Sequence, residues 1–173
     1  MKKIILLLAM FVSSLMVGQN EFEKFESKEG VESIIVTQKM FDLMSKVKVD
    51  AKDKEAQQYL NLLKKLDNLS AYYTSNSKLG GELNSSVTTY LKNNPLDLVS
   101  TTSQDGNAIK VYAKSNANQT NVKELLVVVN GDFKGIKTSV LSVKGDFPIS
   151  DIAMLVKKLN IPVADVLSKV GAN

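Results

Sequence analysis

The hydrophobic period of the sequence changes near Pro95, and this change limits the folds open to the chain. Before it, apolar residues recur at helical spacing; after it, the period becomes that of strands, and we expect four consecutive short strands at 96–102, 108–114, 123–129 and 136–143. The connections at 103–107 and 130–135 contain Asp-Gly and Asn-Gly, which favour hairpin turns. Four hairpin-linked strands after a helix-rich half predict an α+β fold: a single domain with a mostly antiparallel sheet and helices packed on one face.

The first half of the chain supplies the other elements of this fold. We expect strands at 31–37 and 69–75, which are rich in β-branched and aromatic residues. Met40, Phe41, Met44 and Val47 recur at helical spacing and predict a helix. Further helices are expected at about 54–66, at 79–91, at 152–159 with Ser150 as its cap, and from Pro162 onward.

The N-terminus has the three parts of a secretory leader. Lys2 and Lys3 precede an apolar stretch from Ile4 to Val17, and Gly18 offers a small residue at the cleavage position. We therefore predict a signal peptide at 1–18, a polar lead-in at 19–30 and the α+β domain at 31–173. The chain has no cysteine, so it is not a lipoprotein and folds without disulfides. We expect it in the periplasm or secreted, with no membrane span after processing.

Composition argues against several classes of function. The chain has 22 lysines, no arginine and 18 acidic residues, and losing Lys2 and Lys3 leaves 20 lysines and a net charge of +2. Nucleic-acid-binding proteins favour arginine and a clustered basic surface, so we expect no nucleic-acid partner. Histidine and cysteine are absent, which removes His-based triads, thiolate chemistry and the usual zinc sites. No cofactor or metal site is predicted.

Two kinds of enzyme chemistry are alternatives to a non-catalytic role. Ser75-Asn76-Ser77-Lys78 has the S-x-x-K spacing of penicillin-interacting serine enzymes, although the companion S-D-N element is missing. Paired carboxylates for glycoside hydrolysis are conceivable. The candidates for that role are Asp105, Glu124, Asp132 and Asp146. Serine near a helix start and aspartate in turns more often cap or brace the backbone.

The segment 108–114 offers a candidate partner-binding face. Its residues Ile109, Val111 and Ala113 alternate with Lys110, Tyr112 and Lys114, so one side is apolar and the other is basic with a central aromatic ring. We expect Lys137 and Ser139, on a nearby strand, to continue this polar surface. An acidic or sugar-bearing partner would fit such a face, whereas a solvated sheet surface is the simpler interpretation.

Several segments resemble, in their order and spacing, a family of exported Bacteroidota proteins catalogued as domain of unknown function 4252. These segments are 35–44, 69–75, 107–114, 123–126 and the Lys144-Gly145-Asp146 step. The resemblance spans nearly the whole mature chain and implies a fold type and an exported location. It brings no catalytic or ligand residues.

We therefore expect a non-catalytic binding or interaction module of the cell envelope. Its partner would be an envelope protein or a glycan that contacts Lys110, Tyr112 and Lys114. Two alternatives stay open: a small periplasmic enzyme that uses serine-lysine or carboxylate chemistry, and a structural or stress-related envelope protein.

Overall fold

The computed structural model describes residues 21–116 and 121–162. A short 3-10 helix, η2 (Glu23–Phe25), precedes β1 (Glu32–Thr37), α2 (Gln38–Met44) and α3 (Lys54–Leu63). Next come β2 (Leu66–Thr74), α4 (Ser77–Asn93), β3 (Asp97–Gln104), β4 (Asn107–Ser115), β5 (Val122–Phe133) and β6 (Ile136–Phe147). The described part ends with η3 (Ile149–Asp151) and α5 (Ile152–Lys158). The predicted leader and the helix expected after Pro162 lie outside the described residues.

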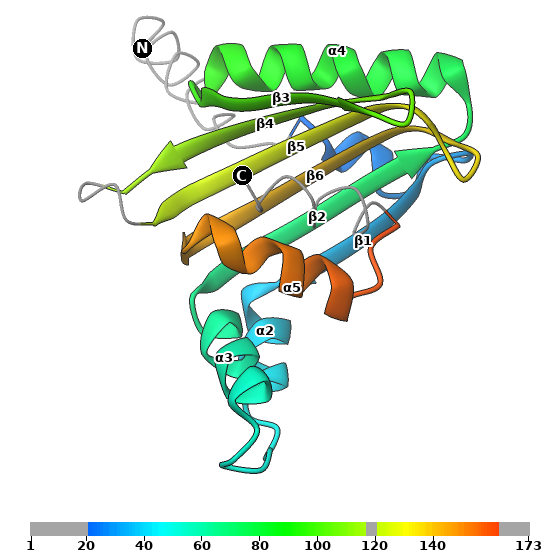
Figure 1. Cartoon of the computed structure of the whole chain (residues 1–173). Coiled ribbons are helices and arrows are strands. Elements are labelled where there is room, and N and C mark those ends of the chain that lie inside the picture. Colours follow the sequence, from blue (N-terminus) through cyan, green and yellow to red (C-terminus); the bar gives the residue numbers. More distant parts are fainter. Residues whose placement is uncertain (1–20, 117–120, 163–173) are drawn as a thin grey trace, which may run out of the picture.

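The six described strands form one antiparallel sheet in the order β1-β2-β6-β5-β4-β3 (Figure 1). Strands β3 to β6 are a meander of successive hairpins, whereas β2 joins the sheet by pairing with the distant β6, with Leu69 opposite Val143. This arrangement confirms the predicted α+β class, the antiparallel sheet and the single domain.

Each of the two predicted hairpins turns at a pair of residues with positive φ, the second of which is glycine. Asp105 and Gly106, with φ of 51° and 78°, make a two-residue turn between β3 and β4, inside the five-residue connection at 103–107 that the sequence predicted. The second hairpin turns at Lys134 and Gly135, with φ of 52° and 85°. Strand β5 continues past Asn130, where the loop was expected to begin, through an irregularity in the ladder. Strand β6 begins at Ile136 as expected but runs on to Phe147, beyond its predicted end at 143.

The sheet is covered on both faces, which differs from the predicted packing of helices on one face. In β5, Leu125, Val127 and Val129 belong to a first hydrophobic cluster with residues of α2, α3 and α5. The alternate residues Leu126 and Val128 belong to a second cluster with residues of α4. Because successive side chains of a strand point to opposite sides, a strand that is apolar throughout needs cover on both. Figure 1 shows α5 crossing the front of the strands.

Residues 21–30 are part of this core, although the sequence predicted a separate polar lead-in. Phe22 and Phe25 are fully buried in the second cluster. The Phe22 ring stacks on Tyr72 with the ring centroids 5.8 Å apart, and an ion pair joins Lys28 to Glu82 of α4. Two aromatic side chains therefore anchor a segment whose other residues are mostly polar.

The helix starts are set by residues other than those predicted. Asn76 caps α4 by accepting hydrogen bonds from the backbone amides of Lys78 and Leu79. Asp53 caps α3 in the same way through Ala56. The first turn of α5 has Asp151 at its cap position without a side-chain cap bond, so Ser150 does not have the capping role expected of it.

Glycine at position 80 lets α4 approach the sheet closely. A methyl group built there would lie 2.5 Å from Oγ1 of Thr138, a residue of β6 that is 4% exposed. A methyl group built in the same way at the next residue, Gly81, meets no atom within 4 Å. These adjacent glycines share a helix but differ in surroundings, so they form a matched pair.

We expect Gly80→Ala to lower the free energy of unfolding by roughly 1–3 kcal/mol, because the added methyl group must displace Thr138 or the helix. Gly81→Ala should raise it by about 0.5–1 kcal/mol, the ordinary gain in helix propensity. Urea denaturation of both variants measures the difference. Equal stabilisation by the two substitutions would show that α4 is not held against β6 in this way.

Candidate functional site

Strand β4 presents a basic side and an apolar side. Ile109, Val111 and Ala113 are buried in the first cluster, while Lys110 and Lys114 are exposed on the opposite side. Tyr112, expected to be exposed, is half-buried, because its ring packs on the edge of the second cluster. The lysine–tyrosine face (Lys110, Tyr112 and Lys114) is therefore an exposed surface whose aromatic ring packs partly against the core.

This face lies beside the part of the sheet that α4 contacts most closely. The main contacts of α4 with the sheet are with β6 and β2, on the far side of β5 from β4. Tyr112 lies between Leu126 of β5 and Leu98 of β3, and Leu98 is 55% exposed. Strand β3 forms the edge of the sheet and has no buried residue. The candidate surface thus combines two lysines, one aromatic ring and an exposed leucine.

A carboxylate borders the face at one end. Glu124 of β5 pairs across the strands with Lys114 and Lys144, and its side chain is only 12% exposed. The Tyr90 hydroxyl donates a hydrogen bond to Glu124, whose Oε1 lies 3.8 Å from Nζ of Lys144. Lys144 also lies over the Tyr90 ring, 5.5 Å from its centroid. This network ties α4 to β5 and β6 and gives Glu124 a structural role.

Two buried tyrosines have strongly perturbed acidity. Burial is the main cause that raises the pKa of Tyr90 far above its ordinary value, and the hydrogen bond to Glu124 adds to it. Burial likewise raises the pKa of Tyr72 to about 12, with a smaller contribution from Glu26, which accepts a hydrogen bond from its hydroxyl. Both phenols therefore stay protonated in the folded chain well above the pH at which they ionise in the unfolded chain.

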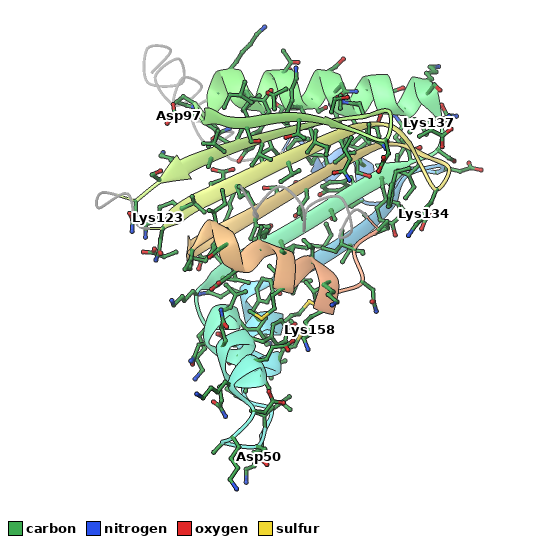
Figure 2. The ribbon with its side chains drawn as sticks, viewed as in Figure 1. Asp50, Asp97, Lys123, Lys134, Lys137 and Lys158 are labelled. Carbon is green, nitrogen blue, oxygen red and sulfur yellow. The ribbon has the colours of Figure 1, made fainter. Side chains whose placement is uncertain are left out.

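Two of the other carboxylates considered for catalysis, Asp132 and Asp146, lie apart, and each pairs with a lysine. Asp132 forms an ion pair with Lys137 in the β5–β6 hairpin, which lowers its pKa. Asp146 accepts from Lys123 at 2.6 Å and from Asn121 at 2.8 Å, and its pKa is lowered by these hydrogen bonds. Figure 2 shows Lys137 and Lys123 at opposite ends of the sheet. The structure thus does not bring Asp132 and Asp146 together.

The serine-lysine motif lacks its helical geometry. Ser75 is exposed in the bend before α4, which begins at Ser77, so Ser75 and Lys78 do not lie one turn apart on a helix. Ser75 does line a shallow hollow of about 400 Å³ with Glu32, Tyr73 and Lys134. Lys78 is not among the residues of that hollow.

The expected extension of the lysine–tyrosine face to β6 is wrong for Ser139. Ser139 is buried and pairs with Val129, whose side chain belongs to the first cluster. Lys110 pairs with Val128, which belongs to the second cluster. The register therefore places Ser139 and Lys110 on opposite sides of the sheet.

Within the described residues, no group of three or more carboxylates is placed to hold a metal ion. The described helices include none that is long and apolar enough to cross a membrane.

Together, the fold and this surface define a single α+β domain whose six-stranded antiparallel sheet is covered on both faces but open along its β4–β3 edge. Residues 25–155, about three quarters of the chain, match the profile of the family DUF4252, described as a domain of unknown function. The chain belongs to this family. No curated protein and no solved structure matches it.

The raised pKa of Tyr72 predicts a loss of stability at alkaline pH. The unfolded phenol ionises near its ordinary value of 10.0, but the folded phenol ionises only near 12, so the folded state binds more protons between these values. The contribution to stability is complete below pH 10 and is lost as the pH rises toward 12.

Urea denaturation across this range should therefore show a steeper decline for the wild-type chain than for Tyr72→Phe, which has no phenol to ionise. Comparing slopes removes the pH-independent cost of the substitution and the shared titration of lysines. Parallel curves would contradict the assigned burial of the Tyr72 hydroxyl.

Proposed function

We propose that this chain is an exported, non-catalytic binding module that docks an acidic or sugar-bearing partner of the cell envelope on the lysine–tyrosine face. The observation that carries the proposal is the half-buried ring of Tyr112 between two exposed lysines, on the part of the sheet that α4 does not contact closely. A fixed ring costs little conformational entropy on binding, because packing has already ordered it.

The chemistry of this face favours anionic groups on a flat partner. Lys110 and Lys114 lie two residues before and after Tyr112, so their side chains emerge on the same side of the strand. Their ammonium groups attract carboxylate or sulfate, and the ring with the exposed Leu98 offers an apolar surface for a sugar ring or an aliphatic side chain. Because the carboxylate of Glu124 lies beside Lys114, we expect anionic groups to bind mainly around Lys110.

Binding to poly-L-glutamate at low ionic strength is the first test of the proposal. We expect Lys110→Ser with Lys114→Ser to weaken binding about tenfold, as the loss of two exposed ion pairs implies. Lys52→Ser with Lys78→Ser, which removes the same charge from exposed lysines elsewhere, should bind like the wild type. Both double variants should unfold within about 0.5 kcal/mol of the wild type.

Affinity capture from the native envelope extends this test to the natural partner. A partner that the wild type and the Lys52/Lys78 control retain, and the Lys110/Lys114 variant loses, supports the docking face. Equal capture by all three proteins contradicts it. Covalent labelling of Ser75 by a fluorescent penicillin would contradict the non-catalytic part of the proposal.

Export is supported by the sequence of the leader, in which Lys2 and Lys3 precede the apolar stretch from Ile4 to Val17. We expect cleavage after Gly18, which leaves a mature chain that starts at Gln19 and carries no lipid. Intact-mass measurement on protein from the native cell checks this. A mass that includes residues 1–18 would contradict processing.

A further inference from the structure

Helix α2 carries an exposed apolar stripe in addition to its buried side. Phe41 is buried and Met44 packs against the first cluster, so this side of α2 faces the core. Met40, Leu43 and Val47, however, are 45%, 60% and 59% exposed. Met40 and Val47 share the helical spacing of Phe41 and Met44 in the sequence, but the structure places their side chains in solvent.

The stripe is continuous because the helical turn extends beyond the end of α2. The backbone amides of Ser45, Lys46 and Val47 donate to the carbonyl groups of Phe41, Leu43 and Met44. Residues three and four apart on such a turn lie on one side, so Met40, Leu43 and Val47 form one row. Three large exposed apolar side chains within eight residues mark an interaction surface.

Lysines accompany this stripe. Lys39, Lys46 and Lys48 are exposed, and Asp42 is the one acidic residue in the segment 38–48, which leaves a net charge of +2. The α2–α3 pair also projects beyond the end of the sheet, and Asp50 lies at its far tip (Figures 1 and 2). An apolar row with basic neighbours on a projecting element is therefore available to a large flat surface.

We propose that the α2 stripe (Met40, Leu43 and Val47) with Lys39, Lys46 and Lys48 binds the surface of an anionic lipid bilayer. The apolar side chains would enter the boundary between headgroups and acyl chains, and the lysines would lie among lipid phosphates. The contact is interfacial and reversible, because three side chains of one short helix bury little area.

A second copy of the chain suits this surface less well. A stable protein interface buries about 800 Å² on each partner, far more than one row on a seven-residue helix offers. A two-fold contact through the stripe would also bring the same lysines of both copies together, which costs affinity. A bilayer needs no complementary groove, and its anionic headgroups neutralise those lysines.

Vesicle co-sedimentation of residues 19–173, which contain every described element, tests the proposal. Vesicles of phosphatidylcholine alone are compared with a mixture that contains about one third phosphatidylglycerol. We expect binding to the anionic vesicles, at least tenfold weaker binding to the neutral ones, and release by salt.

The decisive variant is Leu43→Ser with Val47→Ser, which should weaken binding to anionic vesicles at least tenfold and leave the melting temperature unchanged. Val99→Ser with Ile149→Ser removes comparable apolar side chains, 51% and 42% exposed, from other surfaces and should bind like the wild type. Lys46→Gln with Lys48→Gln should weaken binding to anionic vesicles only. The Lys110/Lys114 variant should keep vesicle binding. The proposed membrane contact and the proposed docking on the lysine–tyrosine face can therefore be refuted independently.

Absence of vesicle binding by the wild type would overturn the proposal. So would an equal loss in the Val99/Ile149 control, which would indicate general hydrophobic adsorption. Analytical ultracentrifugation gives the other contrary result: a wild-type dimer that the Leu43/Val47 variant converts to a monomer would mean that a second copy covers the stripe.

Discussion

The two-sided burial of β5 and β6 is the constraint on which the rest of the structure depends. Val127 and Val128 are consecutive in β5, and each is buried in a different cluster. Neither strand can therefore have a solvated side over its central residues, and cover must arrive from both directions. Helices α2, α3 and α5 supply it on one side, and α4 with the segment 21–30 supplies it on the other.

The cover on the α4 side depends on small and aromatic residues in combination. Gly80 lets the first half of the helix approach β6, while Tyr90 near its end reaches Glu124 through its hydroxyl. Phe22 and Phe25 then fill the space over Tyr72 that α4 does not reach. Because this cover stops short of β4 and β3, the same packing that completes the core leaves the lysine–tyrosine face open.

The spacing of apolar residues and the residue types in the turns were enough to predict the strands and their hairpins. Both signals depend only on residues that are near one another in the sequence. The second layer was missed, although the uninterrupted apolar run Leu125–Val129 signals a strand buried on both sides. The alternation of Lys110 and Val111 followed from strand geometry. The network of Tyr90, Glu124 and Lys144 did not, since it joins a helix to two strands whose register only the folded chain defines. Likewise, helical spacing alone does not show that Phe41 and Met44 face the core while Met40 and Val47 are exposed.

The pairing of β2 with β6 has a consequence for the order in which the chain acquires structure during synthesis. The meander from β3 to β6 pairs strands that are neighbours in the sequence. Leu69 of β2, by contrast, cannot pair until Val143 of β6 has been made. Until β6 has been made, the antiparallel pair of β1 and β2 has no sheet to join, and a two-stranded sheet is only marginally stable alone. The apolar residues of β2 thus remain uncovered until β6 has been made, a window in which a holdase chaperone has a clear target.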